Sequence, residues 1–411
     1  MQTPEIDGRR LWRSLLEMAE VGALPGGGCC RLALSDADRA GRDLFVRWCR
    51  EAGCVVEVDR VGNIFAQRPG TDPGAAAVAT GSHLDTQPHG GRFDGAFGVL
   101  AGLEILRALN QAGVRTVAPV EVVVWTNEEG VRFRPLVGSG VFAGELAVAE
   151  AEELTDAEGA RFGDELVRIG YRGELTPGAR RIGAFVEAHI EQGPLLEEAG
   201  VPIGVVTGVQ GIRWLEVEVA GRDAHAGTTP LVLRRDAVTG MAAMVLGLEE
   251  IARAGDEDLR LTIGRVEVSP NSGGTVAGRA RFNIDLRHPD ATVLDLTEAE
   301  IRGLLDRIAG SRSLGLELRR VLARPPVAFD PGLVELVRQA AETLGLGHRE
   351  MTSGAGHDAM NIAGVAPSAM IFVPCRDGIS HNEAEYASPE DLAAGASVLL
   401  HTILAKAGLG A

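Results

Sequence analysis

The chain has 411 residues, a length that exceeds one ordinary hydrophobic core and favours two domains. Its formal net charge of −17 argues against a nucleic-acid partner, because contacts with phosphates need a basic surface. No apolar stretch approaches the roughly 20 residues of a membrane span, and residues 1–7 lack the features of a signal peptide. The five cysteines have no regular spacing, so the chain is expected to be a soluble cytoplasmic enzyme without a disulfide framework or a membrane partner.

Most of the chain has the pattern of a parallel sheet covered by helices. Helical spacing of apolar residues predicts helices at Arg9–Glu20, Asp36–Ala52 and Gly95–Leu109. Short or continuously apolar runs predict strands at Val55–Asp59, Asn63–Gln67, Ala75–Ala79, Val120–Trp125, Ala184–Ile190 and Ala369–Val373. Buried strands alternating with helices are typical of an α/β fold with a mainly parallel sheet.

The pattern changes near residue 208. Trp214–Val219 alternates apolar and polar residues, as a half-exposed antiparallel strand does. Further strands are predicted at Leu259–Val268, Ala280–Leu286 and Leu316–Val321, and helices at Arg235–Arg253 and Thr297–Ala309. We therefore expect an inserted α+β domain over 208–322, with 1–207 and 323–411 forming one catalytic domain.

Histidines and carboxylates gather at or just past the predicted strands of the catalytic domain. They lie in four short stretches, which contain His83, Asp85 and Asp94; Glu128 and Glu129; His189; and His381. Because ligands bind beyond the carboxyl ends of strands in open α/β sheets, we expect these side chains to converge on one rim. Each one alone has an ordinary explanation as a loop cap, a solvated surface acid or a hydrogen-bonded histidine. Four such stretches on one rim predict a divalent metal site.

The candidates outnumber the ligands that a single tetrahedral metal can use. This excess favours two metal ions that share a bridging carboxylate. Glu128 and Glu129 are adjacent, so their side chains are expected to diverge at the strand end. One of them can bind metal while the other acts as a general base on the attacking water.

Seven motifs, in chain order from residue 81 to 386, resemble those of a known enzyme family. They are GSHLDTQPHGGRFDG, TNEEGVRF, EAHIEQGP, GRDAHAGTTP, NSGGT with NIDLRH, SGAGHDA and GISHNEAEY. The chain resembles the hydantoinase/carbamoylase branch of the dinuclear zinc amidohydrolases, which are related to aminoacylases and carboxypeptidase-type exopeptidases. The resemblance implies a metallopeptidase-like catalytic domain and an inserted ferredoxin-like domain that serves as a lid and in dimerisation.

The resemblance also implies roles for individual residues. His83 and His189 would bind one metal, Glu129 and His381 the other, and Asp94 would bridge them. Asp85 would orient His83, and Glu128 would be the general base. Zinc is the metal expected first, with manganese or cobalt as other candidates.

Further residues would contact the substrate if the resemblance holds. Arg287 would bind a substrate carboxylate, and His225 would reach the active site of a second subunit in a homodimer and polarise the scissile carbonyl. The other expected contacts are Gln192, Gln210, Asn271, Gly356 and His357. From the residues alone, the ordinary explanation is the stronger one for both: Arg287 as a surface strand residue and His225 as a turn residue.

The expected reaction is hydrolysis of the ureido C–N bond of N-carbamoyl-L-amino acids, giving the amino acid, carbon dioxide and ammonia. Allantoate amidohydrolase is the alternative within the family, because its ureido substrate calls for the same metal core. A catalytically inactive metal-binding scaffold is the alternative of another class. Such a protein would be expected to lack the base or a ligand, whereas Glu128 and all five expected ligands are present.

Overall fold

The computed structural model describes residues 4–410, and the chain divides into two compact units. Unit 1 comprises the chain up to Gly208 together with the chain from Ala328 onward, and unit 2 is Val209–Val327. The sequence predicted an insertion over 208–322. The unit extends further because its last strand continues to Arg324 instead of ending at Val321.

Unit 1 contains a nine-stranded mixed sheet. Its strands in spatial order are β1 (Val55–Val58), β2 (Ile64–Arg68), β4 (Val120–Trp125), β3 (Ala77–His83), β5 (Ile182–Ile190), β16 (Ser368–Val373), β6 (Ile203–Val209) and β14 (Val327–Ala328), while β15 (His348–Ser353) also pairs with β6. The four central strands β4, β3, β5 and β16 are parallel, as the buried apolar runs predicted. The neighbours β2 and β6 pair with this centre in the antiparallel direction, which the sequence pattern did not reveal.

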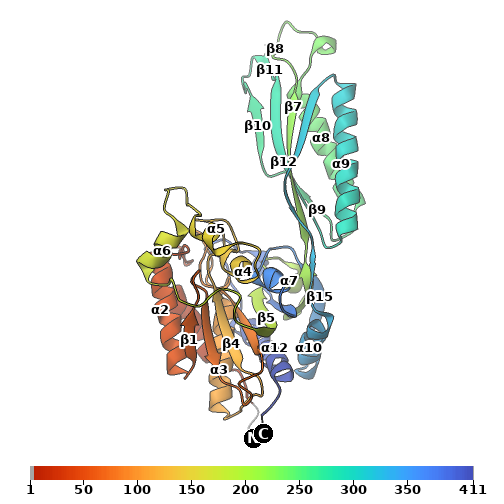
Figure 1. Ribbon diagram of the computed structural model, residues 1–411. Coiled ribbons are helices and arrows are strands. Elements are labelled where there is room, and N and C mark those ends of the chain that lie inside the picture. The colour runs from red at the N-terminus through yellow and green to blue at the C-terminus, as the bar shows by residue number, and fades with distance from the viewer. Residues whose placement is uncertain (1–3, 411) are drawn as a thin grey trace. The chain divides into compact units, whose positions relative to one another are not determined.

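Helices cover the sheet of unit 1 (Figure 1). The longer ones are α1 (Gly8–Ala19), α2 (Asp36–Glu51), α3 (Ala96–Gln111), α10 (Pro331–Thr343) and α12 (Pro389–Ala407). The shorter ones are α4 (Val137–Phe142), α5 (Val148–Glu152), α6 (Phe162–Ile169), α7 (Leu195–Ala199), α11 (Asp358–Ile362) and the 3-10 turn Arg376–Gly378. The helices α3 and α12 contact the central strands, and β3, β4 and β16 are buried along their whole length. No helix within residues 4–410 is long and apolar enough to cross a membrane.

Strand β3 is longer than predicted, and the extension determines where His83 lies. The apolar run ends at Ala79, but the strand continues to His83 in parallel register with β4. Gly81 makes this possible, because it adopts φ +151° and a Cβ atom there would lie 1.9 Å from the carbonyl oxygen of Val123. His83 is therefore held by the rigid sheet and not by a loop.

Unit 2 is an antiparallel sheet with two helices on one face (Figure 1). Its main elements are β7 (Gly211–Ala220), α8 (Ala237–Ala254), β9 (Arg260–Thr262), β10 (Val266–Ser269), β12 (Arg279–His288), α9 (Ala291–Ser311) and β13 (Gly315–Arg324). With β9 and β10 counted as one interrupted strand, the order is βαββαβ, and with the strand order β10-β12-β7-β13 it gives a ferredoxin-like topology. The predicted strand Leu259–Val268 was wrong in one respect: the chain breaks it into β9 and β10, which pair with different parts of β12.

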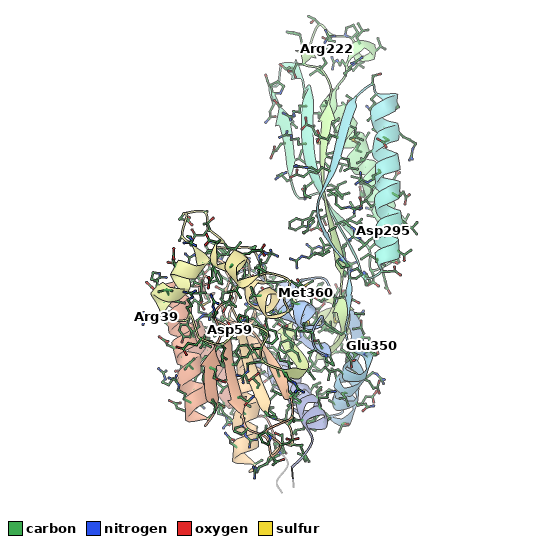
Figure 2. All side chains as sticks on the ribbon, viewed as in Figure 1. Arg39, Asp59, Arg222, Asp295, Glu350 and Met360 are labelled. Carbon is green, nitrogen blue, oxygen red and sulfur yellow. The ribbon has the colours of Figure 1, made fainter. Side chains whose placement is uncertain are left out.

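A small two-stranded sheet completes unit 2. It pairs β8 (Ala224–His225) with β11 (Thr275–Val276), and the 3-10 turn Leu231–Leu233 follows β8 in the chain. Arg222, two residues before β8, and Asp295, on α9, lie at opposite ends of the unit (Figure 2). His225 is therefore carried at the end of unit 2 that is remote from Asp295.

Candidate metal centre

The carboxyl ends of the central parallel strands carry the candidate ligands of unit 1. His83 is the last residue of β3, and His189 is the penultimate residue of β5. Glu128 and Glu129 follow β4, and His381 lies in the loop after β16. Because these strands are neighbours in the sheet, residues distant in sequence meet at one rim.

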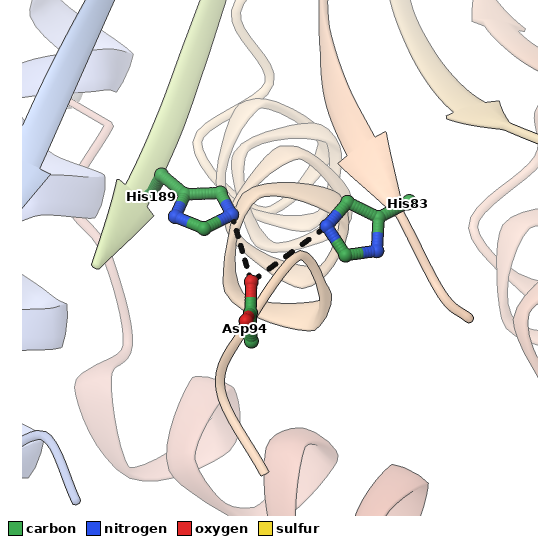
Figure 3. A group of neighbouring side chains, drawn as sticks. All are labelled: His83, Asp94 and His189. Carbon is green, nitrogen blue, oxygen red and sulfur yellow. Dashed lines mark ion pairs between the residues drawn. The ribbon is translucent and has the colours of Figure 1, made fainter. Parts of the chain in front are cut away.

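Two histidines face one carboxylate at the first candidate ion position (Figure 3). Asp94 Oδ1 lies 3.1 Å from Nε2 of His189 and 3.7 Å from Nε2 of His83. The other ring nitrogen of each histidine is engaged by a backbone carbonyl, Asp85 at 2.8 Å for His83 and Ile190 at 2.9 Å for His189. These hydrogen bonds place the Nδ1 protons away from Asp94, so both Nε2 atoms are oriented as metal ligands.

A second group of three ligands shares the same carboxylate. His381 Nε2 lies 3.3 Å from Asp94 Oδ2 and 3.4 Å from Glu129 Oε2. Gln192 donates a hydrogen bond from Nε2 to the same Asp94 Oδ2 over 3.0 Å. In both groups the ligand atoms lie within 4.8 Å of one another, as they do in a third group, Glu187, His189 and His357, which does not include Asp94. Asp94 thus presents one oxygen to each of the first two groups, which is the arrangement expected of a bridging ligand between two ions.

The charges of these groups indicate a place for cations. Burial alone would raise the pKa of Asp94, but hydrogen bonds from His189 and His381 hold it well below its usual value. Burial disfavours charge on His189, yet its contact with Asp94 raises the pKa of that imidazole to about 9. The Asp94 hydrogen bond also raises the pKa of His381 to about 9. Without metal, protons on the two histidines balance the negative charge of Asp94. A metal cation could take the place of these protons, because imidazole nitrogens and carboxylate oxygens are ligands that suit zinc.

Glu128 and Glu129 have different surroundings although they are adjacent. Glu129 accepts hydrogen bonds from the backbone N–H of Gln87 over 3.1 Å and from its side-chain amide over 2.7 Å. Burial raises the pKa of Glu129 to about 7. Glu128 Oε2 lies 3.6 Å from Nε2 of His83, and burial, followed by the charge of Glu129, raises the pKa of Glu128 well above its usual value. A carboxyl group with a raised pKa beside the cluster has the property of a general base or acid.

Asp85 contacts His83 differently from the way the sequence suggested. Its backbone carbonyl, and not its carboxylate, makes the short contact with His83 Nδ1; the carboxylate lies 3.9 Å away. The carboxylate oxygens instead accept hydrogen bonds from the backbone N–H groups of Glu128, over 3.3 Å, and Glu129, over 3.2 Å. Asp85 therefore holds His83 with its backbone carbonyl and the backbone of the two glutamates with its carboxylate.

The backbone around the cluster is strained at several positions. Gly95 has φ +63°, and a Cβ atom there would lie 2.4 Å from the His83 ring. Asn127, Gln192 and His381 also have positive φ values of 57°, 58° and 53°, although they are not glycine. In residues other than glycine, such conformations cost on the order of 1–3 kcal/mol each and concentrate at functional sites. Each lies within or directly beside a segment that carries a candidate ligand.

Two further expected substrate contacts of unit 1 flank this cluster. His357 is buried, and its ring centroid lies 4.6 Å from that of His189. Its Nε2 is 2.9 Å from the Ser353 hydroxyl, and burial lowers its pKa well below the usual value, so the ring is neutral. Gly356 precedes it in the same loop and is half-buried.

The remaining expected substrate contacts belong to unit 2. His225 is exposed on β8, and its Nδ1 accepts hydrogen bonds from two backbone N–H groups. Arg287 on β12 donates two hydrogen bonds to Asp285, over 2.9 and 2.8 Å. Asn271 is exposed with φ +54°, and Gln210 is buried with its amide 3.4 Å from a backbone carbonyl. All five expected ligands, by contrast, belong to unit 1.

The sequence analysis assigned no role to two buried glutamates of unit 1. Glu187 on β5 accepts hydrogen bonds from the Ser82 hydroxyl over 2.6 Å and from the Ala359 N–H over 2.8 Å. It therefore joins the segments that carry His83 and His357. Glu385 has a similar position beside Asp94. The sequence did offer a signal for Glu187, because it is a carboxylate in a mostly apolar strand and lies two residues before the candidate ligand His189.

Comparison with known proteins establishes the family. The sequence profile of Peptidase family M20/M25/M40 matches residues 79–405, a span that contains all five candidate ligands, Glu128 and the whole of unit 2. The chain therefore belongs to this family of hydrolases, in its hydantoinase/carbamoylase branch. This confirms the fold class and the family expected from the sequence motifs.

Individual relatives cover almost the whole chain. An amidase of the hydantoinase/carbamoylase family from Burkholderia multivorans is 51% identical, with a TM-score of 0.96 and 99% of both chains covered. An N-carbamoyl-L-amino-acid amidohydrolase of Rhizobium meliloti is 48% identical over 98% of this chain and 97% of its own length. A ureidoglycolate hydrolase of Arabidopsis thaliana is 34% identical over 98% of this chain and 87% of its own length. The protein is thus an amidohydrolase.

Proposed function

We propose that unit 1 binds two divalent metal ions that share Asp94. His83 and His189 would hold one ion, and Glu129 and His381 the other. The observation that carries this proposal is that the two oxygens of Asp94 face two separate pairs of ligands, His83 with His189 and His381 with Glu129. Zinc suits these nitrogen and oxygen ligands, and manganese or cobalt could be accepted by the same set.

The proposed reaction is hydrolysis of N-carbamoyl-L-amino acids to the amino acid, carbon dioxide and ammonia. In support, the carbamoyl-amino-acid relative shares 48% of its residues with this chain, against 34% for the ureidoglycolate hydrolase. Both comparisons cover 98% of this chain, so the difference is not one of coverage. Allantoate would be a poorer substrate on this account.

Glu128 would carry the proton transfers of the reaction. When bound, divalent ions polarise a carbonyl group and increase the acidity of water. Glu128 would accept the proton of the attacking water and return it to the leaving nitrogen, because its carboxyl group lies beside His83 and has a raised pKa. Asp85 would keep Glu128 in place through its hydrogen bond to the backbone. Gln192 would hold Asp94 Oδ2 and line the site with Gly356 and His357.

Unit 2 would supply substrate recognition. Arg287 would bind the α-carboxylate with its guanidinium group, and Gln210 and Asn271 would hydrogen-bond the substrate. In the neutral His225 ring, the two N–H donors to Nδ1 place the proton on Nε2. This exposed N–H is suited to polarise the scissile carbonyl, and we infer that it does so in the active site of a second subunit of a homodimer.

A substrate panel tests the proposal. Ammonia release would be followed with N-carbamoyl-L-amino acids of different side chains, N-carbamoyl-β-alanine and allantoate, using zinc- or manganese-loaded protein. N-acetyl amino acids and dipeptides serve as controls and are followed through the free amine. We expect L-carbamoyl amino acids to be turned over fastest. Hydrolysis of the controls alone would contradict the substrate assignment, and allantoate as the best substrate would move the protein to ureide degradation.

A further inference from the structure

Glu385 is a buried carboxylate between the two loops that carry Asp94 and His381. Its side chain is buried, with only 4% of the residue exposed, and it is not itself a member of any group of possible metal ligands. We propose that Glu385 is a positioning residue that fixes Asp94 relative to His381, and thereby sets the affinity for the ion held by Asp94, Glu129 and His381. This inference rests on the proposed function, since it assumes that the two groups bind metal.

One oxygen of Glu385 holds the backbone of the Asp94 loop. Oε1 accepts hydrogen bonds from the backbone N–H groups of Phe93, over 2.9 Å, and Asp94, over 3.2 Å. The approach is so close that a Cβ atom on Gly91 would lie 1.9 Å from the Glu385 carboxyl carbon. Only glycine at position 91 leaves room for this carboxylate.

The other oxygen of Glu385 holds the His381 loop. Oε2 accepts a hydrogen bond from the Ser380 hydroxyl over 3.0 Å. The same hydroxyl lies 3.2 Å from Asp94 Oδ2, the oxygen that faces His381. The Glu385 side chain thus links the loop of one ligand to the loop of the other, although the two loops are almost 300 residues apart in sequence.

The contacts of Glu385 are directed at one of the two ion positions. Its Ser380 link reaches Asp94 Oδ2, whereas His83 and His189 face Asp94 Oδ1 and are held by carbonyls of their own strands or loops. Loss of Glu385 would therefore loosen the Glu129–His381 position more than the other. His381 also lies on the more exposed side, with 51% of its side chain accessible, so it depends more on this support.

The test is calorimetric titration of metal-free protein with zinc, in the wild type and four variants. Glu385→Ala removes all three hydrogen bonds. Glu385→Gln keeps an oxygen for the two backbone N–H groups and an amide that can donate to Ser380. Ser380→Ala keeps both backbone hydrogen bonds of Glu385 but removes the link to the second loop, together with the contacts of the hydroxyl with Asp94 Oδ2 and the Gln192 amide. Glu383→Ala is the matched control, because Glu383 lies in the same loop but pairs with the exposed His89.

We expect wild type to bind two ions per chain and Glu385→Ala to weaken one of them about 10- to 100-fold, the usual effect of removing an outer support of a metal ligand. The other ion should change much less. Ser380→Ala should shift the same ion in the same direction by a smaller factor. Glu385→Gln and Glu383→Ala should stay near wild type. Thermal melting of the metal-free variants establishes that each is folded.

Several results would overturn the inference. If Glu385→Ala bound both zinc ions with the affinities of the wild type, Glu385 would not position the ligands, and the proposed function would stand. Equal weakening in Glu385→Gln would assign the effect to the charge and not to the hydrogen bonds. Equal weakening in Glu383→Ala would make it a general property of the loop. Wild-type protein that binds no zinc, manganese or cobalt would overturn the proposed function and this inference together.

Discussion

The two units use acidic side chains in opposite ways. In unit 1, Glu128 and Glu129 sit at the buried rim among other carboxylates, and burial raises their pKa values. In unit 2, Glu216 and Glu218 lie on the exposed face of the sheet, and each contacts two arginines. Hydrogen bonds from those arginines lower the pKa values of both glutamates.

The difference shows where a cation is expected. It costs free energy to bury several carboxylates together without cations beside them. A protein that keeps such a cluster therefore stabilises it in another way or uses it for a function. The arginine-paired glutamates of unit 2 have their counter-charges within the chain, as the solvated face of an antiparallel sheet does. We interpret the unit 1 cluster as a site for external cations, and the unit 2 charges as part of its surface.

The largest expected effect comes from Glu128→Gln. This change keeps the shape of the side chain but removes the proton acceptor, so turnover should fall about 100- to 10,000-fold. Zinc content should remain as in the wild type, because Glu128 is not one of the proposed ligands. Activity would be measured as ammonia release, beside metal analysis of the same preparation. Turnover that survives would show that another group is the base.

Removal of metal should affect unit 1 selectively. Ions that bind only the folded protein stabilise it by about 2.7 kcal/mol when the free ion is at 100 times its Kd. Hydrogen exchange followed by mass spectrometry should therefore become faster in the β3 and β5 segments after chelation. The β7 and β12 segments of unit 2 should exchange as before. Equal acceleration in both units would remove the distinction drawn between them.

Arg287→Ala tests whether this charged residue of unit 2 binds the substrate or is only part of the charged surface. Loss of charge-assisted hydrogen bonds to a substrate carboxylate should lower kcat/KM about 10- to 100-fold. Arg281→Ala is the matched control on the same strand, since Arg281 pairs with Glu218 on the sheet face. If both variants lose activity equally, the effect belongs to the fold of unit 2.

Glu218→Gln should have the smallest effect. Arg279 and Arg281 lower the pKa of Glu218 to about 2, below its ordinary value of 4.5. A depressed carboxyl pKa contributes stability above pH 4.5 that is lost as the pH falls towards 2. Because Glu218 is on the surface, solvent and salt screen this contribution. The melting temperature of Glu218→Gln should differ slightly from that of the wild type at pH 7 and still less near pH 2. A large difference at pH 7 would show that the ion pairs with Arg279 and Arg281 stabilise the fold.

The sequence predicted the parts of unit 1 that follow local patterns. His83 and His189 could be placed because apolar strand runs precede or surround them, and the family that the motifs indicated was confirmed by the comparison with known proteins. The pattern could not show that β3 continues to His83, because Gly81 and Ser82 are not apolar. Nor could it show that Glu385 contacts Asp94, since that contact depends on how two distant loops meet. In unit 2, the pairing of β9 and β10 with different parts of β12 divides what appeared as one strand.

Crystallography with anomalous scattering from zinc-loaded protein is the most direct test of the central claim. The account predicts two anomalous peaks per chain, one between Asp94 and the histidines His83 and His189, the other between Asp94, Glu129 and His381. Ions bridged by one carboxylate lie about 3.5–4 Å apart. A single peak, or peaks away from Asp94, would contradict the assignment of unit 1 as a dinuclear metal site.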